Sequence, residues 1–216
     1  MFIENTIASL KITLLSGLTR YSQSTILDEC LNPPPLWRHV IKLTDLKSNT
    51  DYFGMAEGHL KKLAQLRALA EAYERLCRDQ FEKASQRTVN RAYPFGLGVG
   101  MRKRSAQLRA YGEYWERRGH SRAPLLEDGQ QVIESIKTPV GTIWVCFSKG
   151  TDGILGSGYG QESAQAEDSA LRSMRRKKDF PQNQVEFKVP NDTPQLIRIT
   201  PVRDAWLECY LVGHLI

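Results

Sequence analysis

The sequence predicts an α/β (α+β) fold, a sandwich of sheet and helices built from repeated units of strand, glycine turn and helix. The first observation is that the pentapeptide AQLRA occurs twice, at 64–68 and 106–110, each time after a glycine-containing segment and within a helical pattern. The second is that strand-like runs at 184–189, 195–200 and 205–212 follow one another without an intervening helix. Since parallel strands need a crossover between them, these runs disfavour a purely parallel, doubly wound sheet.

The repeated unit keeps a fixed register. Counted from the last glycine of each turn, at Gly58, Gly100 and Gly160, all three copies carry Ala at +6 and +10. The first two copies add Glu at +13 and +16 and Arg at +17, whereas the third has Ser173 and Arg176 at the acidic positions. We interpret the alanines as small residues that let each helix approach the sheet. The carboxylates are not explained by packing and therefore point to function.

Three strands are predicted ahead of the C-terminal runs, at 6–14, 37–43 and 141–148, because these stretches are rich in apolar and β-branched residues. Residues 16–25 are rich in turn-forming residues and are expected to separate the first two strands.

Three helices are predicted, at about 58–78, 101–118 and 161–177. One face of the first helix is expected to be buried, because its apolar residues recur at three- and four-residue spacing. These residues are Leu60, Leu63, Leu66, Ala70 and Tyr73. Residues 79–93 are polar and are expected outside the helix. The segment 120–131 places Pro and Gly between periodic stretches, which makes it the best candidate for an internal linker. We predict a single compact domain over 1–216.

The composition limits the classes of function. The 216 residues carry a net charge of +6, which suits an anionic partner such as a nucleotide or a nucleic acid. No apolar run approaches the roughly 18 residues that cross a bilayer, so no membrane association is expected. The four cysteines and four histidines are scattered without metal-ligand spacing. That scatter fits a cytoplasmic protein with buried or idle thiols.

The acidic ends of the first two repeat helices supply candidate metal ligands. Glutamates three residues apart lie on one face of a helix, and crowded like charges favour a cation between them. Two facing pairs would provide four carboxylates, and Mg²⁺ prefers such oxygen ligands together with substrate phosphates. The four candidate ligands are Glu71, Glu74, Glu113 and Glu116.

Cations and glycines beside these glutamates are candidate nucleotide-binding residues. Arg75 and Arg117 follow the acidic pairs, and each guanidinium can donate two parallel hydrogen bonds to phosphate oxygens. Gly98 and Gly100 would open backbone N–H groups to a phosphate at the start of a helix. The alternative hypothesis is a duplicated structural unit whose helix ends carry solvated salt bridges. The shared register of the two copies favours the metal and nucleotide hypothesis.

The order of these motifs resembles that of the YcaO family. Four segments are similar to the family's motifs in the same order: SGLTRYSQSTILDE (16–29), GHLKKLAQLRALAEAYER (58–75), FGLGVGMRKRSAQLRAYGEYWERR (95–118), and TPVGTIWVCF (138–147) followed by GSGYGQESAQAEDSALRSMRR (156–176). The resemblance covers most of residues 16–177. It implies a YcaO-like sheet-and-helix sandwich.

The resemblance also implies a chemistry. YcaO enzymes use ATP to phosphorylate a backbone amide oxygen of a peptide, so that phosphate leaves after a Cys, Ser or Thr side chain or a sulfide has attacked the amide carbon. ATP and Mg²⁺ are the implied cofactors, with the four glutamates holding Mg²⁺ and Arg117 near the phosphates. The products would be azolines, amidines or thioamides, as in cyclodehydratases of RiPP biosynthesis.

The expected partners follow from the same resemblance. They are a substrate peptide or protein and a separate recognition protein. Because the chain is short, completion of the site by homodimerisation is also left open.

The chain departs from the family pattern at two places. Pro94 and Phe95 replace a Ser-Asn pair, which removes a polar contact to phosphate or metal. The third helix has Leu171-Arg172-Ser173 where Glu or Gln is usual. No catalytic nucleophile or base is identified, so ATP–Mg²⁺ binding is better supported than any one peptide chemistry. A degenerate relative that binds nucleotide or a partner protein without turnover is the first alternative.

Basic clusters support a second alternative, a nucleic-acid-binding protein. The cations at 102–104 and the run RSMRRKK at 172–178 can contact a nucleic acid backbone. The third block also loosely resembles a double-stranded RNA-binding module. Solvated cations at a helix C-terminus are better explained by the helix dipole, so nucleic acid ranks below nucleotide as a partner.

Overall fold

The chain folds into antiparallel sheets and helices that form two compact units. The computed structural model describes residues 21–31, 36–120, 125–179, 187–200 and 208–216. Every strand register given for these residues is antiparallel, so the prediction against a purely parallel sheet is confirmed. The mixed class and the sheet-and-helix architecture predicted from the sequence are confirmed as well.

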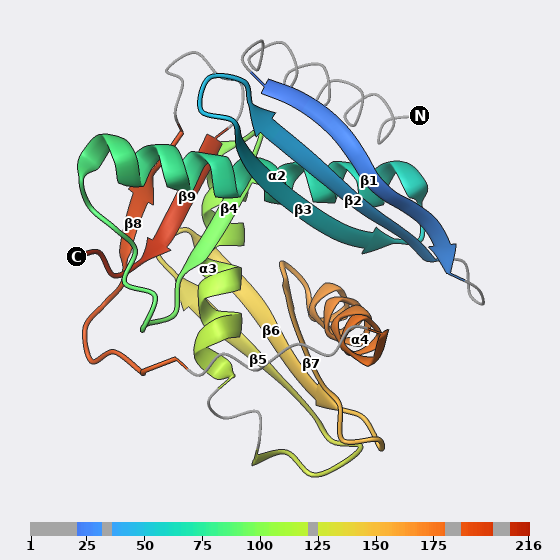
Figure 1. The fold of residues 1–216 in the computed structure, drawn as a ribbon. Coiled ribbons are helices and arrows are strands. Elements are labelled where there is room, and N and C mark those ends of the chain that lie inside the picture. Colours follow the sequence, from blue (N-terminus) through green and yellow to red (C-terminus); the bar gives the residue numbers. More distant parts are fainter. Residues whose placement is uncertain (1–20, 32–35, 121–124, 180–186, 201–207) are drawn as a thin grey trace. The chain divides into compact units, whose positions relative to one another are not determined.

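The first unit is a three-stranded sheet with a helix on one face. Strands β1 (Tyr21–Leu31), β2 (Leu36–Asp45) and β3 (Thr50–Gly58) pair in that order. Helix α2 (Lys61–Ser85) runs across β2 and β3 (Figure 1). A buried stripe holds it there, which confirms the prediction that one face of this helix is buried. The residues predicted for that face are mostly wrong: Tyr73 is buried, whereas Leu60 is exposed and Leu63, Leu66 and Ala70 are half-buried. The stripe is formed by Ala64, Ala68, Leu69, Ala72, Tyr73, Leu76 and Cys77.

The second unit contains two helices, a second sheet and most of a third, of which Val99, Gly100, Glu208 and Cys209 belong to the first unit. Strands β5 (Gln131–Thr138), β6 (Gly141–Lys149) and β7 (Leu155–Gly160) form one sheet. Strands β4 (Gly96–Gly100), β9 (Glu208–Gly213) and β8 (Gln195–Arg198) form the other, in that order. The two helices are α3 (Lys103–Gly119) and α4 (Ser163–Asp179) (Figure 1).

The two helices of this unit cover opposite faces of the β5–β6–β7 sheet. On β7, Gly158 meets Ala170 of α4, whereas the next residue, Tyr159, meets Gly112 of α3. Since successive residues of a strand point to opposite faces, α3 and α4 lie on different sides. Helix α3 also packs on β4 through Gly98, so it lies between the two sheets of its unit. The main core of the unit forms around α3.

The glycines that precede each helix lie in strands. They belong to β3, β4 and β7, and the last glycine of each copy is the last residue of its strand, so the prediction of glycine turns is wrong. In each copy, a Cβ on the glycine four residues before the end of the strand would fall 1.9, 2.1 or 2.3 Å from a helix carbonyl oxygen. The contacting pairs are Gly54–Ala68, Gly96–Ala110 and Gly156–Ala170. The interpretation of the +10 alanines as residues that let the helix approach the sheet is confirmed. The strand glycines opposite them allow the same close approach, because they have no Cβ.

Helix α2 ends later than predicted. It begins at Lys61 and continues to Ser85, so residues 79–85 are helical instead of lying in a polar connection. Asp79 explains the difference: it accepts a hydrogen bond from the Tyr52 hydroxyl at 2.6 Å and pairs with Lys83, one turn on, at 2.7 Å. Polar residues in this segment form hydrogen bonds and ion pairs that stabilise the helix. A polar stretch of sequence therefore does not by itself distinguish an exposed helix from a loop.

The remaining predictions have mixed outcomes. The strands at 37–43 and 141–148 lie within β2 and β6, and the second and third helices match α3 and α4 closely. Residues 21–25 lie in β1, because a ladder with β2 overrides their turn-forming composition. Residues 187–189 are not in a strand.

Several predictions fall on residues that the structure does not describe. The strand at 6–14, residues 16–20, and parts of the runs at 184–189 and 205–212 lie outside the described residues. The same holds for residues 121–124 of the linker candidate. The single domain stays a prediction. In the part of the chain that is described, no helix combines the length and the apolarity that a bilayer crossing requires.

We predict that Gly54→Ala destabilises the protein far more than Gly58→Ala on the same strand. At Gly54 the new Cβ would meet a backbone oxygen at 1.9 Å, whereas at Gly58 the nearest atom lies at 3.5 Å, an ordinary contact. Overpacking of this kind costs about 1–3 kcal/mol of unfolding free energy. Urea unfolding of the two variants measures it, and equal stabilities would contradict the strand-to-helix contact.

Candidate functional site

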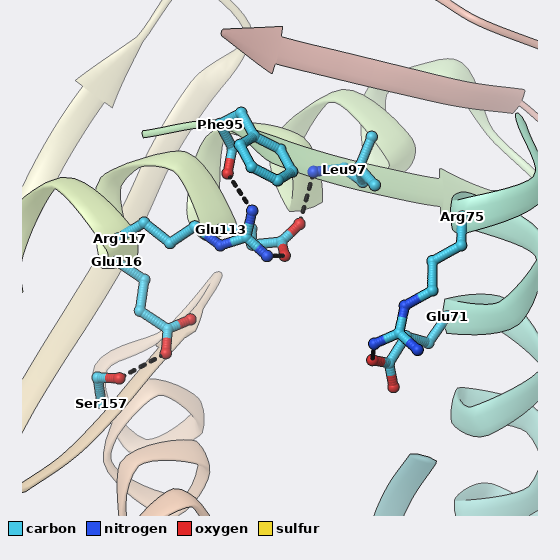
Figure 2. Close-up of polar contacts among 8 residues, drawn as sticks. All are labelled: Glu71, Arg75, Phe95, Leu97, Glu113, Glu116, Arg117 and Ser157. Carbon is cyan, nitrogen blue, oxygen red and sulfur yellow. Dashed lines mark hydrogen bonds and ion pairs between the residues drawn. The ribbon is translucent and has the colours of Figure 1, made fainter. Parts of the chain in front are cut away.

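The first glutamate and the arginine of the first repeat bind the strand of their own repeat. Glu71 Oε2 accepts the backbone N–H of Met55 at 2.9 Å. Arg75 Nη1 donates to the carbonyl oxygen of Phe53 at 2.5 Å. Its Nη2 pairs with Glu71 Oε1 at 2.5 Å (Figure 2). The pair therefore satisfies one donor and one acceptor of β3.

The second repeat makes the same contacts at the same register. Glu113 Oε2 accepts the backbone N–H of Leu97 at 2.5 Å. Arg117 donates to the carbonyl oxygen of Phe95 at 2.7 Å and forms an ion pair with Glu113 (Figure 2). The guanidinium also lies over the Phe95 ring, 4.2 Å from its centroid. Phe95, which departs from the family pattern, is thus fully engaged with Arg117.

The third repeat keeps half of this arrangement. Lys177, at the position of the two arginines, donates to the carbonyl oxygen of Leu155 at 2.8 Å. Ser173 replaces the glutamate. In all three copies, therefore, the cation 17 residues after the last glycine of the strand binds the backbone carbonyl five residues before that glycine. We call this contact the strand clamp.

The strand clamp has a structural reason. Strands β3, β4 and β7 each stand at the end of a sheet among the described strands. Such a strand presents N–H and C=O groups that no neighbouring strand satisfies. Leaving a buried backbone group unpaired costs free energy comparable to a lost hydrogen bond. The alternative hypothesis of structural salt bridges therefore accounts for Glu71, Arg75, Glu113 and Arg117, whose roles toward metal and nucleotide stay predictions.

The second glutamate of each pair contacts the strand of the following repeat. Glu74 Oε1 accepts the backbone N–H of Val99 on β4 at 2.9 Å. Glu116 Oε1 accepts the hydroxyl of Ser157 on β7 at 2.7 Å (Figure 2). The two carboxylates of each helix, which look equivalent in the sequence, thus have different partners.

The Glu116 carboxyl group has a perturbed pKa. Burial raises its pKa, and although the Ser157 hydroxyl lowers it, repulsion by Glu113 adds to the rise. The positive charges of Arg117 and Arg176 oppose that rise. Among the described residues, Oε2 of Glu116 has no hydrogen-bond donor. A desolvated carboxylate with one open oxygen fits a hard divalent cation such as Mg²⁺.

His120 and Ser157 extend this site and were missed in the sequence. His120 Nε2 lies 2.8 Å from Ser157 Oγ, so a continuous hydrogen-bonded chain joins His120, Ser157 and Glu116. Burial, together with the charges of Lys177 and Arg117, lowers the pKa of His120 to about 4. The only sequence signal was the spacing of His120, one helical turn after Glu116; Ser157 gave none.

The predicted phosphate-binding glycines lie in β4. Gly98 packs on α3, where a Cβ would fall 2.1 Å from the carbonyl oxygen of Ala106. Gly100 is the last residue of the strand. Packing alone thus explains Gly98, and the phosphate role of Gly98 and Gly100 stays a prediction.

Several cations of the basic clusters are engaged within the second unit. Arg172 pairs with Asp168, and Lys178 pairs with Asp152 at 3.3 Å. With Lys177 in the strand clamp, three of the five cations at the end of α4 have protein partners. This use weakens the case for a nucleic acid surface on that helix.

No group of three or more His, Cys, Asp or Glu side chains within the described residues is arranged to hold a metal ion. The predicted Mg²⁺ site of four glutamates stays a prediction.

The fold resembles two solved structures. One is a YcaO from Methanopyrus kandleri bound with AMPPCP and Mg²⁺, with a TM-score of 0.59 at 9% identity over 97% of this chain and 89% of that chain. The other is a heterocyclase in complex with substrate and cofactor, with a TM-score of 0.50 at 11% identity over 97% of this chain and 51% of that chain. The chain therefore spans about half of the heterocyclase. No protein-family model and no curated protein sequence matches the chain. The fold is YcaO-like, as the sequence resemblance implied.

We predict that Arg117→Met lowers the unfolding free energy by about 1–3 kcal/mol, because it removes charged hydrogen bonds to Phe95 and Glu113. Arg117→Lys should lose less than half as much, since Lys177 holds the equivalent carbonyl in the third repeat. Chemical denaturation without ligands checks both variants. Unchanged stability of Arg117→Met would contradict the strand clamp.

We also predict a pH dependence that is specific to His120. Its folded pKa of about 4 lies below its ordinary value of 6.5, so unfolding takes up a proton between these pH values. Stability is therefore present above pH 6.5 and is lost as the pH falls toward 4. Between pH 7 and pH 5 the wild type should lose about 2 kcal/mol more than His120→Gln. Denaturation curves at both pH values measure the difference, and parallel losses would refute a buried neutral His120.

Proposed function

We propose that this protein is an ATP- and Mg²⁺-dependent YcaO-like enzyme that activates a backbone amide of a peptide or protein by O-phosphorylation. Its products are azolines, amidines or thioamides. The observation that carries the proposal is the desolvated Glu116 carboxylate, which occupies the second acidic position of a duplicated helix in a YcaO-like fold. The similar Methanopyrus kandleri structure was solved with AMPPCP and Mg²⁺, which supports the same ligands here.

In the proposed reaction, the nucleophile replaces the amide oxygen on the amide carbon. A Cys, Ser or Thr side chain adds to the amide carbon for an azoline, an amine for an amidine, and a sulfide for a thioamide. The amide oxygen takes the γ-phosphoryl group, and ADP leaves. Phosphate then leaves with the former amide oxygen, and the nucleophile loses its proton to solvent. Where a C=N bond forms, as in an azoline or amidine, the amide nitrogen also loses its proton to solvent, whereas a thioamide keeps that proton and the sulfide loses both of its own. Positioning and electrostatic stabilisation of the phosphate charge are the main tasks of such a site.

The residues divide these tasks in the proposal. The glutamates of α2 and α3 hold Mg²⁺, which neutralises phosphate charge when it is bound. Arg75 and Arg117 lie beside them, and Arg117 is fixed by Phe95 and Glu113. A substrate peptide or protein and a separate recognition protein complete the proposed assembly.

A second candidate is a relative that binds nucleotide, or only a partner protein, without turnover. Phe95 favours it, because its carbonyl and its ring both hold Arg117 where a polar pair is usual in the family. Nucleotide binding without release of ADP in the presence of candidate peptides would support this candidate over the enzyme.

We predict that Mg²⁺ and ATP together raise the melting temperature, and that Glu116→Gln abolishes the rise. At a ligand concentration of 100 times Kd, binding adds about 2.7 kcal/mol of stability, or roughly 5–10 °C for a chain of this size. Glu134→Gln is the matched control, since Glu134 is exposed on β5 in the same unit. Calorimetric titration gives the affinities. A wild type without any response to Mg²⁺ and ATP would overturn the proposed function.

A further inference from the structure

The hydroxyl of Ser157 has one proton and two hydrogen-bond partners. It donates to Glu116 Oε1 at 2.7 Å, and His120 Nε2 lies 2.8 Å from the same oxygen. Because the single hydroxyl proton goes to the carboxylate, His120 must act as the donor to Ser157 through an Nε2–H group. The chain therefore runs in one direction, from His120 through Ser157 to Glu116.

Both members of this chain are held rigidly. Ser157 is 3% exposed and lies between Gly156 and Gly158, which both pack on α4, while its own side chain faces α3. The His120 ring meets Phe147 edge-on, with ring centroids 6.1 Å apart. The hydroxyl and the imidazole thus have little freedom to move away from the carboxylate.

The consequence for Glu116 is that its two oxygens become different. Oε1 is occupied by Ser157, and Oε2 is left without a donor among the described residues. A glutamate with free rotation about its side-chain bonds must lose that freedom when it binds a cation. Here the hydrogen bond has already fixed the carboxylate. Such outer contacts typically account for 10–100-fold in metal affinity.

The other repeats carry apolar residues at the position of Ser157. The residues equivalent to Ser157 are Met55 and Leu97, which offer only backbone groups at that position. Glu74, the counterpart of Glu116, accepts a backbone N–H from Val99. The Ser157 contact with Glu116 is made by a side chain and can therefore be removed by substitution.

We propose that Ser157 and His120 are positioning residues that orient the Glu116 carboxylate for the Mg²⁺ of a bound nucleotide. This inference rests on the proposed function. It assigns roles to two side chains that neither the repeat register nor the family motifs single out.

The test is the Mg²⁺ concentration that gives half of the ATP-induced rise in melting temperature, measured on the full chain at fixed ATP. Ser157→Ala should raise this concentration by about 10–100-fold. Ser148→Ala, the same change at a buried serine opposite Gly156 on β6, should leave it unchanged. His120→Phe should shift it in the same direction as Ser157→Ala, whereas His120→Gln keeps an N–H donor and should restore most of the response.

The outcomes separate the two proposals. A wild type that responds to Mg²⁺ and ATP, with the same Mg²⁺ requirement in Ser157→Ala, overturns the positioning role and leaves the proposed function standing. A wild type that does not respond overturns both. If Ser157→Ala fails to fold, the His120 pair decides: equal Mg²⁺ requirements in His120→Phe and His120→Gln overturn the inference. The melting temperatures without ligand report any purely structural effect.

Discussion

The close approach of a glycine-bearing strand to a helix is the constraint on which the rest of this structure depends. In each repeat a strand glycine faces the carbonyl of an alanine so closely that a Cβ would fall about 2 Å from the oxygen. Only this distance lets side chains at +13 and +17 reach from the helix to the backbone of the strand. The charged residues of the repeat therefore depend on its glycines and alanines, since their side chains reach the strand backbone only when the helix packs this closely.

The division of work between the carboxylates follows from the geometry of that approach. The glutamate at +13 lies over its own strand and, with the arginine at +17, satisfies backbone groups there. The glutamate at +16 is turned toward the strand of the next repeat. The third repeat, which has Ser173 and Arg176 at these positions, keeps only the cation that binds the strand carbonyl. Structure therefore explains the first acid of each pair, and the second is the better candidate for ligand chemistry.

Much of the fold follows from the sequence, since periodicity and the repeat register predict three helices and several strands. The prediction of glycine turns is wrong because a turn and a close strand-to-helix contact both favour glycine. The sequence alone does not distinguish the two roles, and the helix atoms opposite Gly54, Gly96 and Gly156 show that the role is close contact. The extension of α2 depends on Tyr52, which is distant in sequence from Asp79. For the site, spacing identifies Glu116. Its contact with Ser157 spans 41 residues and arises only when β7 packs on α3.

The hydrogen bond from each acidic helix to the strand of the next repeat fixes the order in which the repeats follow one another. Glu74 of the first copy bonds β4 of the second, and Glu116 of the second bonds β7 of the third. These bonds use strand and helix residues and none from the connecting segments. A chain that lengthens or shortens its connections would therefore keep them, whereas one that reorders its repeats would not. The third copy is in this sense a terminus: it receives a carboxylate from its predecessor and, with Arg176 at +16, offers none to a successor.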